Sequence, residues 1–462
     1  MVNNLAAGGG TIAAISTPAG SGGIGVIRMS GAKALSILKN IFQPHSPACN
    51  FSSHRLYYGQ VVNPENHKIM DEVLAVYMQA PATYTREDVV EIHCHGSFFI
   101  LQDVLELLIS QGAALAEPGE FTKRAFLNGR IDLTRAEAVV DILSAKTRKG
   151  IDFAQEQLAG ALYKRIAAIR NSLMRILALL EVSIDFPDED LEIIDYRQQQ
   201  AILREEVLAP IERLIAGADR GKIFRSGVSI VIVGLPNAGK SSLLNAMLQE
   251  ERALVTPVPG TTRDFIEEYV DIGGMPARLI DTAGIREDAG EVEALGIKRA
   301  MELINGADLV LFLYDAAAGF GREEAELLAT VSRKQLIIVQ NKNDIDGWQA
   351  ALPENLYRLP RVAVSAKKQD GIEELNKLIF NKISGEDQWQ EEGCPPNLRH
   401  RAALVKAYES CQRLKSGFAG QATSDLLAAD LQDALGYLGD IVGETTTEDV
   451  LDLIFAEFCL GK

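Results

Sequence analysis

The segment from Gly234 to Ser241 restricts the fold of this chain more than any other stretch. Its residues, Gly-Leu-Pro-Asn-Ala-Gly-Lys-Ser, match the pattern G-x-x-x-x-G-K-[ST]. The apolar run Val228–Val233 before it has the length of a buried strand, and Ser242–Leu248 after it has a helical pattern. A glycine-rich loop in this setting turns backbone N–H groups toward phosphate at a helix N-terminus. We therefore expect a nucleotide-binding domain with a parallel sheet, in which Lys240 neutralises the β- and γ-phosphates and Ser241 binds Mg²⁺.

Four further motifs follow in the order of a guanine-nucleotide switch protein: Gly260-Thr261-Thr262, Asp281-Thr282-Ala283-Gly284, Asn341-Lys342-Asn343-Asp344 and Ser365-Ala366-Lys367. A Thr262 hydroxyl suits Mg²⁺ and the γ-phosphate, Asp281 suits the water shell of the ion, and the Gly284 amide suits the γ-phosphate. The Asp344 carboxylate can accept the N1–H and N2–H donors of guanine, a pair that adenine does not offer. One such motif alone is more often a turn or a helix cap, but all five in order predict a Ras-like GTPase domain. The expected GTP contacts are Asn237, Ala238, Gly239, Lys240, Ser241, Ser242, Thr256, Thr261, Thr262, Asp281, Thr282, Ala283, Gly284, Asn341, Lys342, Asp344, Ser365, Ala366 and Lys367.

One position departs from the Ras-like pattern. The residue after Asp-Thr-Ala-Gly, where those proteins carry a water-orienting glutamine, is Ile285. Isoleucine cannot hydrogen-bond water, so another polar residue must orient the water or hydrolysis is slow. The candidates just downstream are Glu287, Asp288, Glu291 and Glu293. For any one of these four, a solvated acidic loop is the commoner explanation.

The pattern of apolar and polar residues changes three times along the chain. Its length of 462 residues predicts several domains. Short strand-like and helical runs alternate up to Pro118, and long helices follow. Buried strand patterns return near residue 220, and helices return after Pro395-Pro396. We expect a multidomain α/β protein with an α+β domain at 1–118, a helical domain in two parts at 119–219 and 383–462, and an inserted Ras-like domain at 220–382. An independent C-terminal helical bundle remains an alternative.

Composition narrows the cellular setting. The net charge of −17 excludes a simple basic nucleic-acid coat. Five cysteines without C-x-x-C spacing indicate a reducing compartment. The sequence contains no run of 18 apolar residues, the length that would predict a membrane span, so we expect a cytoplasmic protein. Basic residues outnumber acidic ones between Lys123 and Arg175. This stretch is either a nucleic-acid surface or the solvated face of long helices.

Two short motifs suggest chemistry that their surroundings do not support. Gly20-Ser-Gly-Gly-Ile-Gly25 fits G-x-G-x-x-G, but the residues after it have a strand pattern instead of a helical one. His93-Cys94-His95 resembles a metal cluster, but in a strand Cys94 points to the opposite face from the two histidines. We expect neither a dinucleotide site nor a metal site at these positions.

Stretches along nearly the whole chain resemble one family, the MnmE (TrmE) tRNA-modification GTPases. They include Gly22-Gly-Ile-Gly-Val-Ile-Arg28, Glu87-Asp-Val-Val-Glu91, Pro118-Gly-Glu-Phe121, Ile184-Asp-Phe-Pro-Asp188 and the nucleotide motifs. The most specific is the C-terminal Phe458-Cys-Leu-Gly-Lys462, in which Leu460 replaces the isoleucine usual in the family.

This resemblance implies a homodimer formed through the N-terminal domains, with 5-formyl- or methylene-tetrahydrofolate bound between them. The folate contacts would fall on Arg28, Glu91, Arg130 and Lys462, with Arg130 replacing a lysine common in the family. An FAD-containing partner, MnmG (GidA), would join it in a heterotetramer. Together they would add an aminomethyl or carboxymethylaminomethyl group at C5 of the wobble uridine, position 34, of certain tRNAs.

The resemblance also implies catalytic roles that residue spacing does not reveal. Asn237 would bind K⁺ together with oxygens of Thr256, Val258 and Thr261, and Glu293 would orient the attacking water. Cys459 would lie near the modification site, although its pattern beside Phe455 and Phe458 is more often that of a buried core thiol. A regulatory GTPase that binds RNA or ribosomes without chemistry of its own is the alternative function. Such a protein would need neither the folate contacts nor Cys459.

Overall fold

The computed structural model describes residues 10–46, 50–185, 195–250, 268–281, 301–331, 336–345, 352–385, 393–420, 422–456, 458, 459 and 461. These residues form two compact units, each assembled from segments that are distant in the sequence. The first unit comprises residues 1–140, 157–209 and 403–462, and the second comprises residues 141–156 and 210–402.

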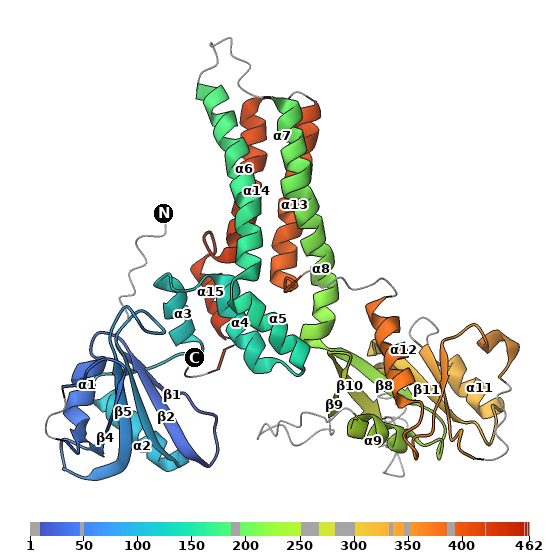
Figure 1. Ribbon diagram of the computed structural model, residues 1–462, viewed down its shortest axis with the longest axis horizontal. Helices are drawn as coiled ribbons and strands as arrows, with labels where there is room; N and C mark the ends of the chain where they lie inside the picture. Colours follow the sequence, from blue (N-terminus) through green and yellow to red (C-terminus); the bar gives the residue numbers. More distant parts are fainter. Residues whose placement is uncertain are drawn as a thin grey trace. The chain divides into compact units, whose positions relative to one another are not determined.

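A mixed sheet forms the N-terminal part of the first unit (Figure 1). Its described strands lie in the order β3-β4-β5-β6-β2-β1-β7, and only the β1–β7 pair is parallel. The strands are β1 (Ile12–Ile15), β2 (Gly22–Ser30), β3 (Phe42–Pro44), β4 (Arg55–Val62), β5 (Ile69–Met78), β6 (Val89–Gly96) and β7 (Ala114–Leu115). The residues after the glycine-rich stretch lie in β2, as the sequence predicted, and the strand already begins at Gly22.

One face of this sheet is covered by helices α1 (Ala34–Ile41) and α2 (Phe98–Ser110), which share its apolar core. In β6, Ile92 and Cys94 are buried in that core, whereas Glu91, His93 and His95 alternate with them on the other face. The predicted separation of Cys94 from the two histidines is therefore confirmed. His95 instead bonds to the buried Asp71 of β5 through its ring nitrogen at 2.7 Å.

The rest of the first unit is helical. Helix α6 has a buried stripe at Ile166, Ile169, Leu173 and Ile176, and it packs along α14. Helical segments from the middle and from the end of the sequence thus pack together within the first unit. The helices are α3 (Glu120–Leu127), α4 (Leu133–Ser144), α6 (Ala161–Asp185), α7 (Tyr196–Ile202), α13 (Leu398–Ala419), α14 (Ser424–Val442) and α15 (Glu448–Ala456). A π-helical turn (Leu203–Leu208) joins α7 to α8 (Ala209–Ser226), which belongs almost entirely to the second unit, as does most of α5 (Arg148–Leu158).

The second unit contains the predicted Ras-like sheet. Its described strands lie in the order β13-β12-β11-β8-β10-β9, and every pair is parallel except β10–β9. Apolar residues of successive strand positions enter two separate cores, one on each face, which explains the continuous apolar runs. The elements are β8 (Val228–Val233), α9 (Lys240–Glu250), β9 (Glu268–Ile272), β10 (Met275–Asp281), β11 (Leu309–Asp315), α11 (Arg322–Ala329), β12 (Leu336–Asn341), a 3₁₀ turn (Glu354–Leu356), β13 (Arg361–Ala363) and α12 (Ile372–Ser384).

The second unit also contains residues 141–156, which the sequence assigned to the helical domain. This segment includes the end of α4 and most of α5, and it packs against the β9–β10 hairpin. None of the described helices is long and apolar enough to cross a membrane.

Candidate functional site

The phosphate loop connects β8 to α9, and α9 begins at Lys240. The Lys240 ammonium donates to the carbonyl oxygens of Gly234 and Leu235, both at 3.0 Å, so this cation lies inside the loop. Asn237 is exposed and has a positive φ of 65°, unusual for a residue with a side chain. The loop therefore holds the Lys240 ammonium at a helix N-terminus, where a phosphate can bind.

Asn341 ties three of the sequence motifs together. Its buried side-chain amide donates to the Ala238 carbonyl at 2.9 Å and accepts from the Ala366 backbone N–H at 3.1 Å. A Cβ atom on Gly239 would lie 2.3 Å from Nδ2 of Asn341, and Gly239 has a φ of 96°. Only glycine fits at that position.

The base-recognition motifs meet at the carboxyl end of β12. The buried Ser365 hydroxyl donates to Asp344 at 2.7 Å. This hydrogen bond lowers the pKa of Asp344 below its ordinary value, so the side chain is an ionised acceptor at neutral pH. Lys367 is exposed beside this pocket.

Asp315 is a residue of this site that sequence reasoning missed. It ends β11, and its carboxylate pairs with the ammonium of Lys342 at 2.7 Å. Burial, the largest single influence, raises the pKa of Asp315, but the hydrogen bond and charge of Lys342 together with backbone N–H donors outweigh it, so the pKa is lowered. Its position directly after an apolar strand, where functional groups of parallel sheets gather, was the available signal.

On the phosphate side, the Ser241 hydroxyl donates to the Asp281 carboxylate at 2.9 Å. Two oxygen groups expected near Mg²⁺ are thus brought together from α9 and the end of β10. Ser242 is exposed on the first turn of α9. The remaining predicted nucleotide and K⁺ residues lie outside the described residues: Thr256, Val258, Thr261, Thr262, Thr282, Ala283, Gly284 and Glu293.

A second group of polar residues lies on the N-terminal sheet. Arg28 of β2 and Glu91 of β6 are direct cross-strand partners. Both Nε and Nη2 of Arg28 lie 2.8 Å from Oε1 of Glu91, and each side chain is about one-fifth exposed. Nη1 of Arg28 donates to the Gly461 carbonyl at 3.1 Å, which brings the C-terminal tail to this pair. Lys462 itself lies outside the described residues.

Arg130 approaches the same region through Tyr84. Its guanidinium lies 4.7 Å from the centre of the Tyr84 ring, and its Nη1 donates to the Tyr84 carbonyl at 3.2 Å. The Arg28 guanidinium lies 6.0 Å from the same ring. Tyr84, which sequence reasoning missed, therefore lies between the two arginines. A single tyrosine within a loop gives no sequence signal of such a role.

Cys459 has an exposed side chain, so the reading of its pattern as a buried thiol is wrong. Phe458 takes the buried position instead, with its ring centre 5.0 Å from that of Phe455. The Cys459 carbonyl accepts from the Gly119 backbone N–H at 3.4 Å, and this contact holds the main chain while the sulfur faces outward.

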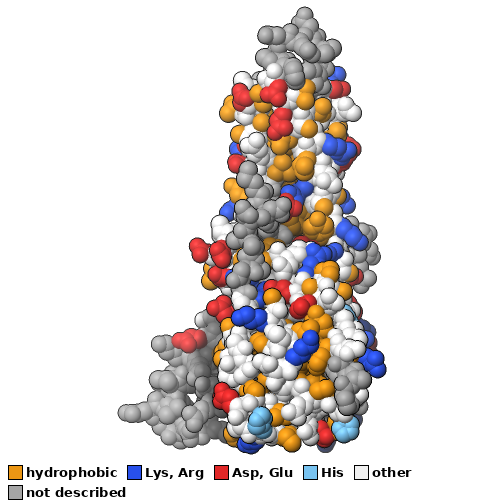
Figure 2. Space-filling model, turned by 90° about the vertical axis from the view of Figure 1, so that its left-hand side faces the viewer, with side chains coloured by type: hydrophobic (Ala, Val, Ile, Leu, Met, Phe, Trp, Pro, Cys, Tyr) orange, Lys and Arg blue, Asp and Glu red, His pale blue; other side chains and the backbone are white. Residues whose placement is uncertain are grey.

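Acidic partners compensate much of the basic stretch between Lys123 and Arg175. Arg124 is buried between Glu87 and Glu120, and Arg170 pairs with Glu444. Figure 2 shows acidic and basic side chains interspersed over one face of the molecule. These pairs favour the solvated-helix explanation over a continuous basic surface.

Two family models cover most of the chain. The model of the MnmE helical domain matches residues 133–459, and the model of the GTP-binding protein TrmE N-terminus matches residues 11–130. The chain belongs to the MnmE family. A relative from Desulfotalea psychrophila is 59% identical over 98% of each chain. Relatives from Geotalea uraniireducens and Natranaerobius thermophilus are 47% and 44% identical over 98% of this chain and 99% of theirs. All three MnmE proteins are described as tRNA modification GTPases.

Proposed function

We propose that the protein hydrolyses GTP and uses the GTPase cycle in tRNA modification. In this proposal it works with a one-carbon tetrahydrofolate and the FAD-containing partner MnmG (GidA). Together they add an aminomethyl or carboxymethylaminomethyl group at C5 of the wobble uridine. The observation that carries the proposal is the meeting of Arg28, Glu91 and the C-terminal tail at one place on the N-terminal sheet. A GTPase that acts only as a switch has no use for such a polar group outside its nucleotide domain.

Recognition of guanine rests on the ionised Asp344. Its carboxylate accepts the two adjacent N–H donors of the base, and Ser365 holds it in position. Asn341 keeps the phosphate loop and the base-binding motifs in register through its two hydrogen bonds. Adenine does not offer this pair of donors, so the Asp344 carboxylate would lose both hydrogen bonds to the base.

Binding of Mg²⁺ fits the residues present, because Ser241 and Asp281 already share a hydrogen bond at the end of the phosphate loop. Ser241 and Thr262 would hold the ion, which would neutralise phosphate charge when bound. Glu293 would orient the attacking water in place of the missing glutamine. Asn237, Thr256, Val258 and Thr261 would hold a K⁺ that offsets transition-state charge.

The folate proposal follows from charge and hydrogen bonding. A pterin offers an amide N–H beside an amino group, and a carboxylate such as Glu91 accepts both. Because Oε1 of Glu91 accepts from Arg28, that guanidinium fixes the orientation of the carboxylate. Arg28, Arg130 and Lys462 would supply the positive charge that meets the acidic groups of the folate. Cys459, exposed on the same tail, would act near the modification site.

The assembly that we propose is a homodimer formed through residues 1–118, joined by MnmG into a heterotetramer in the cytoplasm. Residues 119–219 and 383–462 would form the helical domain, and residues 220–382 the GTPase domain. Transfer RNA is the proposed substrate.

Titration of the purified protein with 5-formyl-tetrahydrofolate tests this function. Wild type should bind it, and Glu91→Gln should weaken binding by about tenfold or more, because an amide cannot accept both donors. Glu72→Gln is the control, because Glu72 is exposed on the same sheet and bonds to Tyr58. Hydrolysis of GTP without any folate binding would favour a regulatory GTPase instead.

A further inference from the structure

The turn between α4 and α5 contacts the β9–β10 hairpin at its tip and on strand β9. The Thr147 hydroxyl donates to the Gly274 carbonyl at 2.8 Å, and only 1% of Thr147 is exposed. The same hydroxyl accepts from the Gly150 backbone N–H at 3.2 Å, which fixes its direction. Lys146 places its ammonium 3.3 Å from the centre of the Tyr269 ring on β9. Two contacts of different chemistry thus hold one hairpin.

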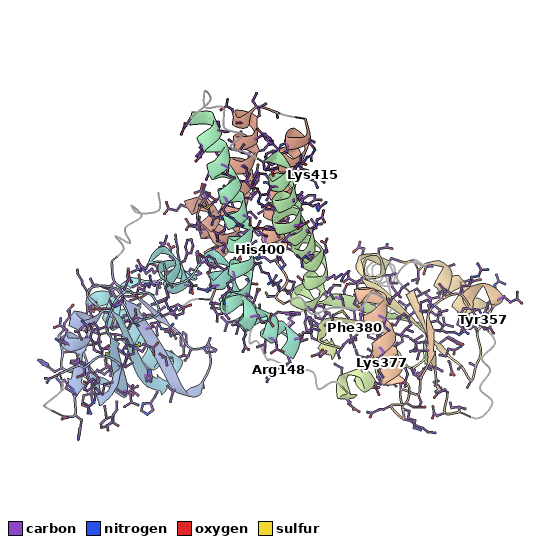
Figure 3. All side chains as sticks on the ribbon, turned by 45° about the horizontal axis from the view of Figure 1, so that its top comes forward. Arg148, Tyr357, Lys377, Phe380, His400 and Lys415 are labelled. Carbon is purple, nitrogen blue, oxygen red and sulfur yellow. The ribbon has the colours of Figure 1, made fainter. Side chains whose placement is uncertain are left out.

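Three aromatic side chains, Phe153, Phe224 and Phe380, pack next to this contact. Lys149 lies against Gly274, and its ammonium is 5.0 Å from the centre of the Phe224 ring. The Phe224 ring centre is 5.8 Å from that of Phe153 on α5 and 6.4 Å from that of Phe380 on α12. Figure 3 labels Phe380 on this helix. These rings connect α5, α8 and α12 next to the hairpin. Because protein interiors are closely packed, a shift of the hairpin would change the packing of all three helices.

The hairpin joins two segments of the proposed nucleotide site. Its first strand follows directly on residues 251–267, which include the expected Mg²⁺ ligand Thr262. Its second strand ends at Asp281, which bonds to Ser241 of the phosphate loop. Nucleotide-dependent movement at either end therefore has a short path to the tip that Thr147 and Lys146 hold.

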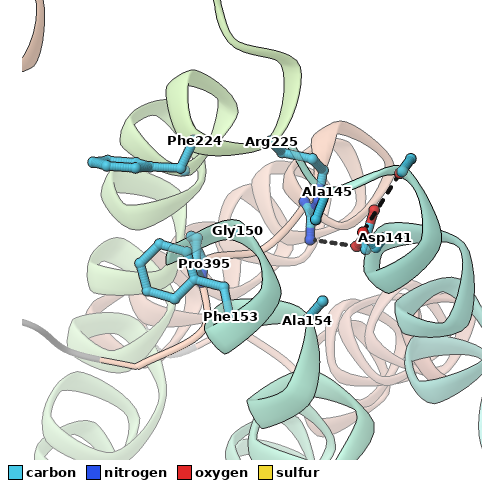
Figure 4. Close-up of a pocket in the computed structure, with 10 residues that line it drawn as sticks. Asp141, Ala145, Gly150, Phe153, Ala154, Phe224, Arg225 and Pro395 are labelled. Carbon is cyan, nitrogen blue, oxygen red and sulfur yellow. Dashed lines mark hydrogen bonds and ion pairs between the residues drawn. The ribbon is translucent and has the colours of Figure 1, made fainter. Parts of the chain in front are cut away.

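The helices beside the hairpin border a small pocket. A cavity of about 20 Å³ lies between α4, α5 and α8, lined by Asp141, Phe153, Gly221, Phe224 and Pro395, among others (Figure 4). The Asp141–Arg225 ion pair, with N and O 2.9 Å apart, closes one side. The pocket leaves room for about one water molecule beside α5 and α8. Helix α4 begins at Leu133 and α5 ends at Leu158, so both continue beyond the second unit.

We propose that Lys146 and Thr147 clamp the β9–β10 hairpin and that this clamp couples the bound nucleotide to helices α4 and α5. In this proposal, the Lys146 and Thr147 contacts are stronger in one of the two states, GDP-bound or GTP-bound, than in the other. By thermodynamic linkage, removing them then changes the affinities for the two nucleotides unequally. A clamp that only supports the fold would change both affinities by the same factor. The proposal rests on nucleotide binding at the phosphate loop, and the wild-type affinities, measured first, separate failure of that assignment from failure of the clamp.

The test compares full-length Thr147→Val and Lys146→Met with wild type. The affinities for GDP and for a non-hydrolysable GTP analogue are measured by titration with Mg²⁺ present. Amide hydrogen exchange of residues 133–158 is measured in both nucleotide states. We expect the ratio of the two affinities to change by about fivefold, the worth of one hydrogen bond, and the wild-type difference in exchange to be lost.

Thr330→Val is the matched control, because the Thr330 hydroxyl also donates to a carbonyl in the second unit, that of Leu327, away from the hairpin. Thermal unfolding checks that each variant is folded. If Thr147→Val does not fold, Lys146→Met carries the test, because Lys146 is exposed. An unchanged affinity ratio, or an undiminished exchange difference, would overturn the proposal.

Discussion

The Gly461 carbonyl accepts a hydrogen bond from the Arg28 guanidinium at 3.1 Å, across 433 positions of sequence. The Ser16 hydroxyl donates to the same carbonyl at 3.1 Å. Gly461 has a φ of 84°, and a Cβ there would lie 2.5 Å from the Ile15 carbonyl oxygen. The tail therefore reaches the edge of the Arg28–Glu91 pair through a position that only glycine can occupy without strain.

Deleting Cys459–Lys462 should separate the two activities that we propose. The deletion removes the tail from Arg28 and leaves the described contacts of the phosphate loop untouched. GTP hydrolysis, measured by phosphate release, should remain close to wild type. Formation of the modified nucleoside in a reaction with MnmG, folate and tRNA should disappear. Loss of both activities together would mean that the tail only supports the fold.

The exposed Cys459 should be the most reactive of the described thiols. Burial raises the pKa of both Cys94 and Cys411 to about 12, so at pH 8 only about one molecule in 10⁴ carries either thiolate. Peptide mass spectrometry after a short iodoacetamide pulse should find Cys459 labelled at least about tenfold faster than these two. Equal labelling of Cys459 and Cys411 in the folded protein would contradict the exposed position.

Base choice depends on Asp344. The Asp344→Asn variant should bind GTP about tenfold or more weakly, because the amide N–H of the new side chain would face an N–H donor of guanine. The variant should favour xanthosine triphosphate, whose C2 carbonyl accepts from that amide. Glu373→Gln on the exposed face of α12 serves as the control. GTP affinity equal to wild type in the Asp344→Asn titration would refute the assignment.

Sequence predicted the two sheets well, because an apolar run between turn residues specifies a buried strand locally. Val228–Val233 is a strand with the bounds expected from its apolar run. The strands β3, β4, β7, β9 and β13 were not predicted, and the pairing of the shortest, β3, β7 and β13, depends on distant neighbours. The contact of Thr147 with Gly274 could not be predicted either, since nothing local distinguishes a turn that packs on a hairpin distant in sequence from a solvated one.

The candidate site divides in the same way. The nucleotide motifs lie within short stretches, and their residue types indicate phosphate and base binding directly. The meeting of Arg28 with Glu91 depends on the register of β2 and β6, and only family resemblance predicted it. Asp315 and Tyr84 had no motif around them, so their contacts with Lys342 and Arg130 required the fold.

Glu293→Ala tests the proposed route of hydrolysis. Removing a water-orienting group should lower the rate by about 100-fold or more and leave GTP affinity nearly unchanged. Replacing K⁺ with Na⁺, which is too small for the proposed cage, should slow wild type and prevent pairing of the GTPase modules. Equal rates of wild type in the two salts, with Glu293→Ala as active as wild type, would contradict the mechanism.

The central claim is that the chain modifies wobble uridines, and nucleoside analysis of tRNA tests it most directly. Transfer RNA from cells that lack this gene is digested and analysed by liquid chromatography and mass spectrometry. The account predicts that the C5-aminomethyl and carboxymethylaminomethyl uridines disappear and return with the wild-type gene, but not with the gene lacking codons for Cys459–Lys462. An unchanged content of these nucleosides in the cells without the gene would contradict it.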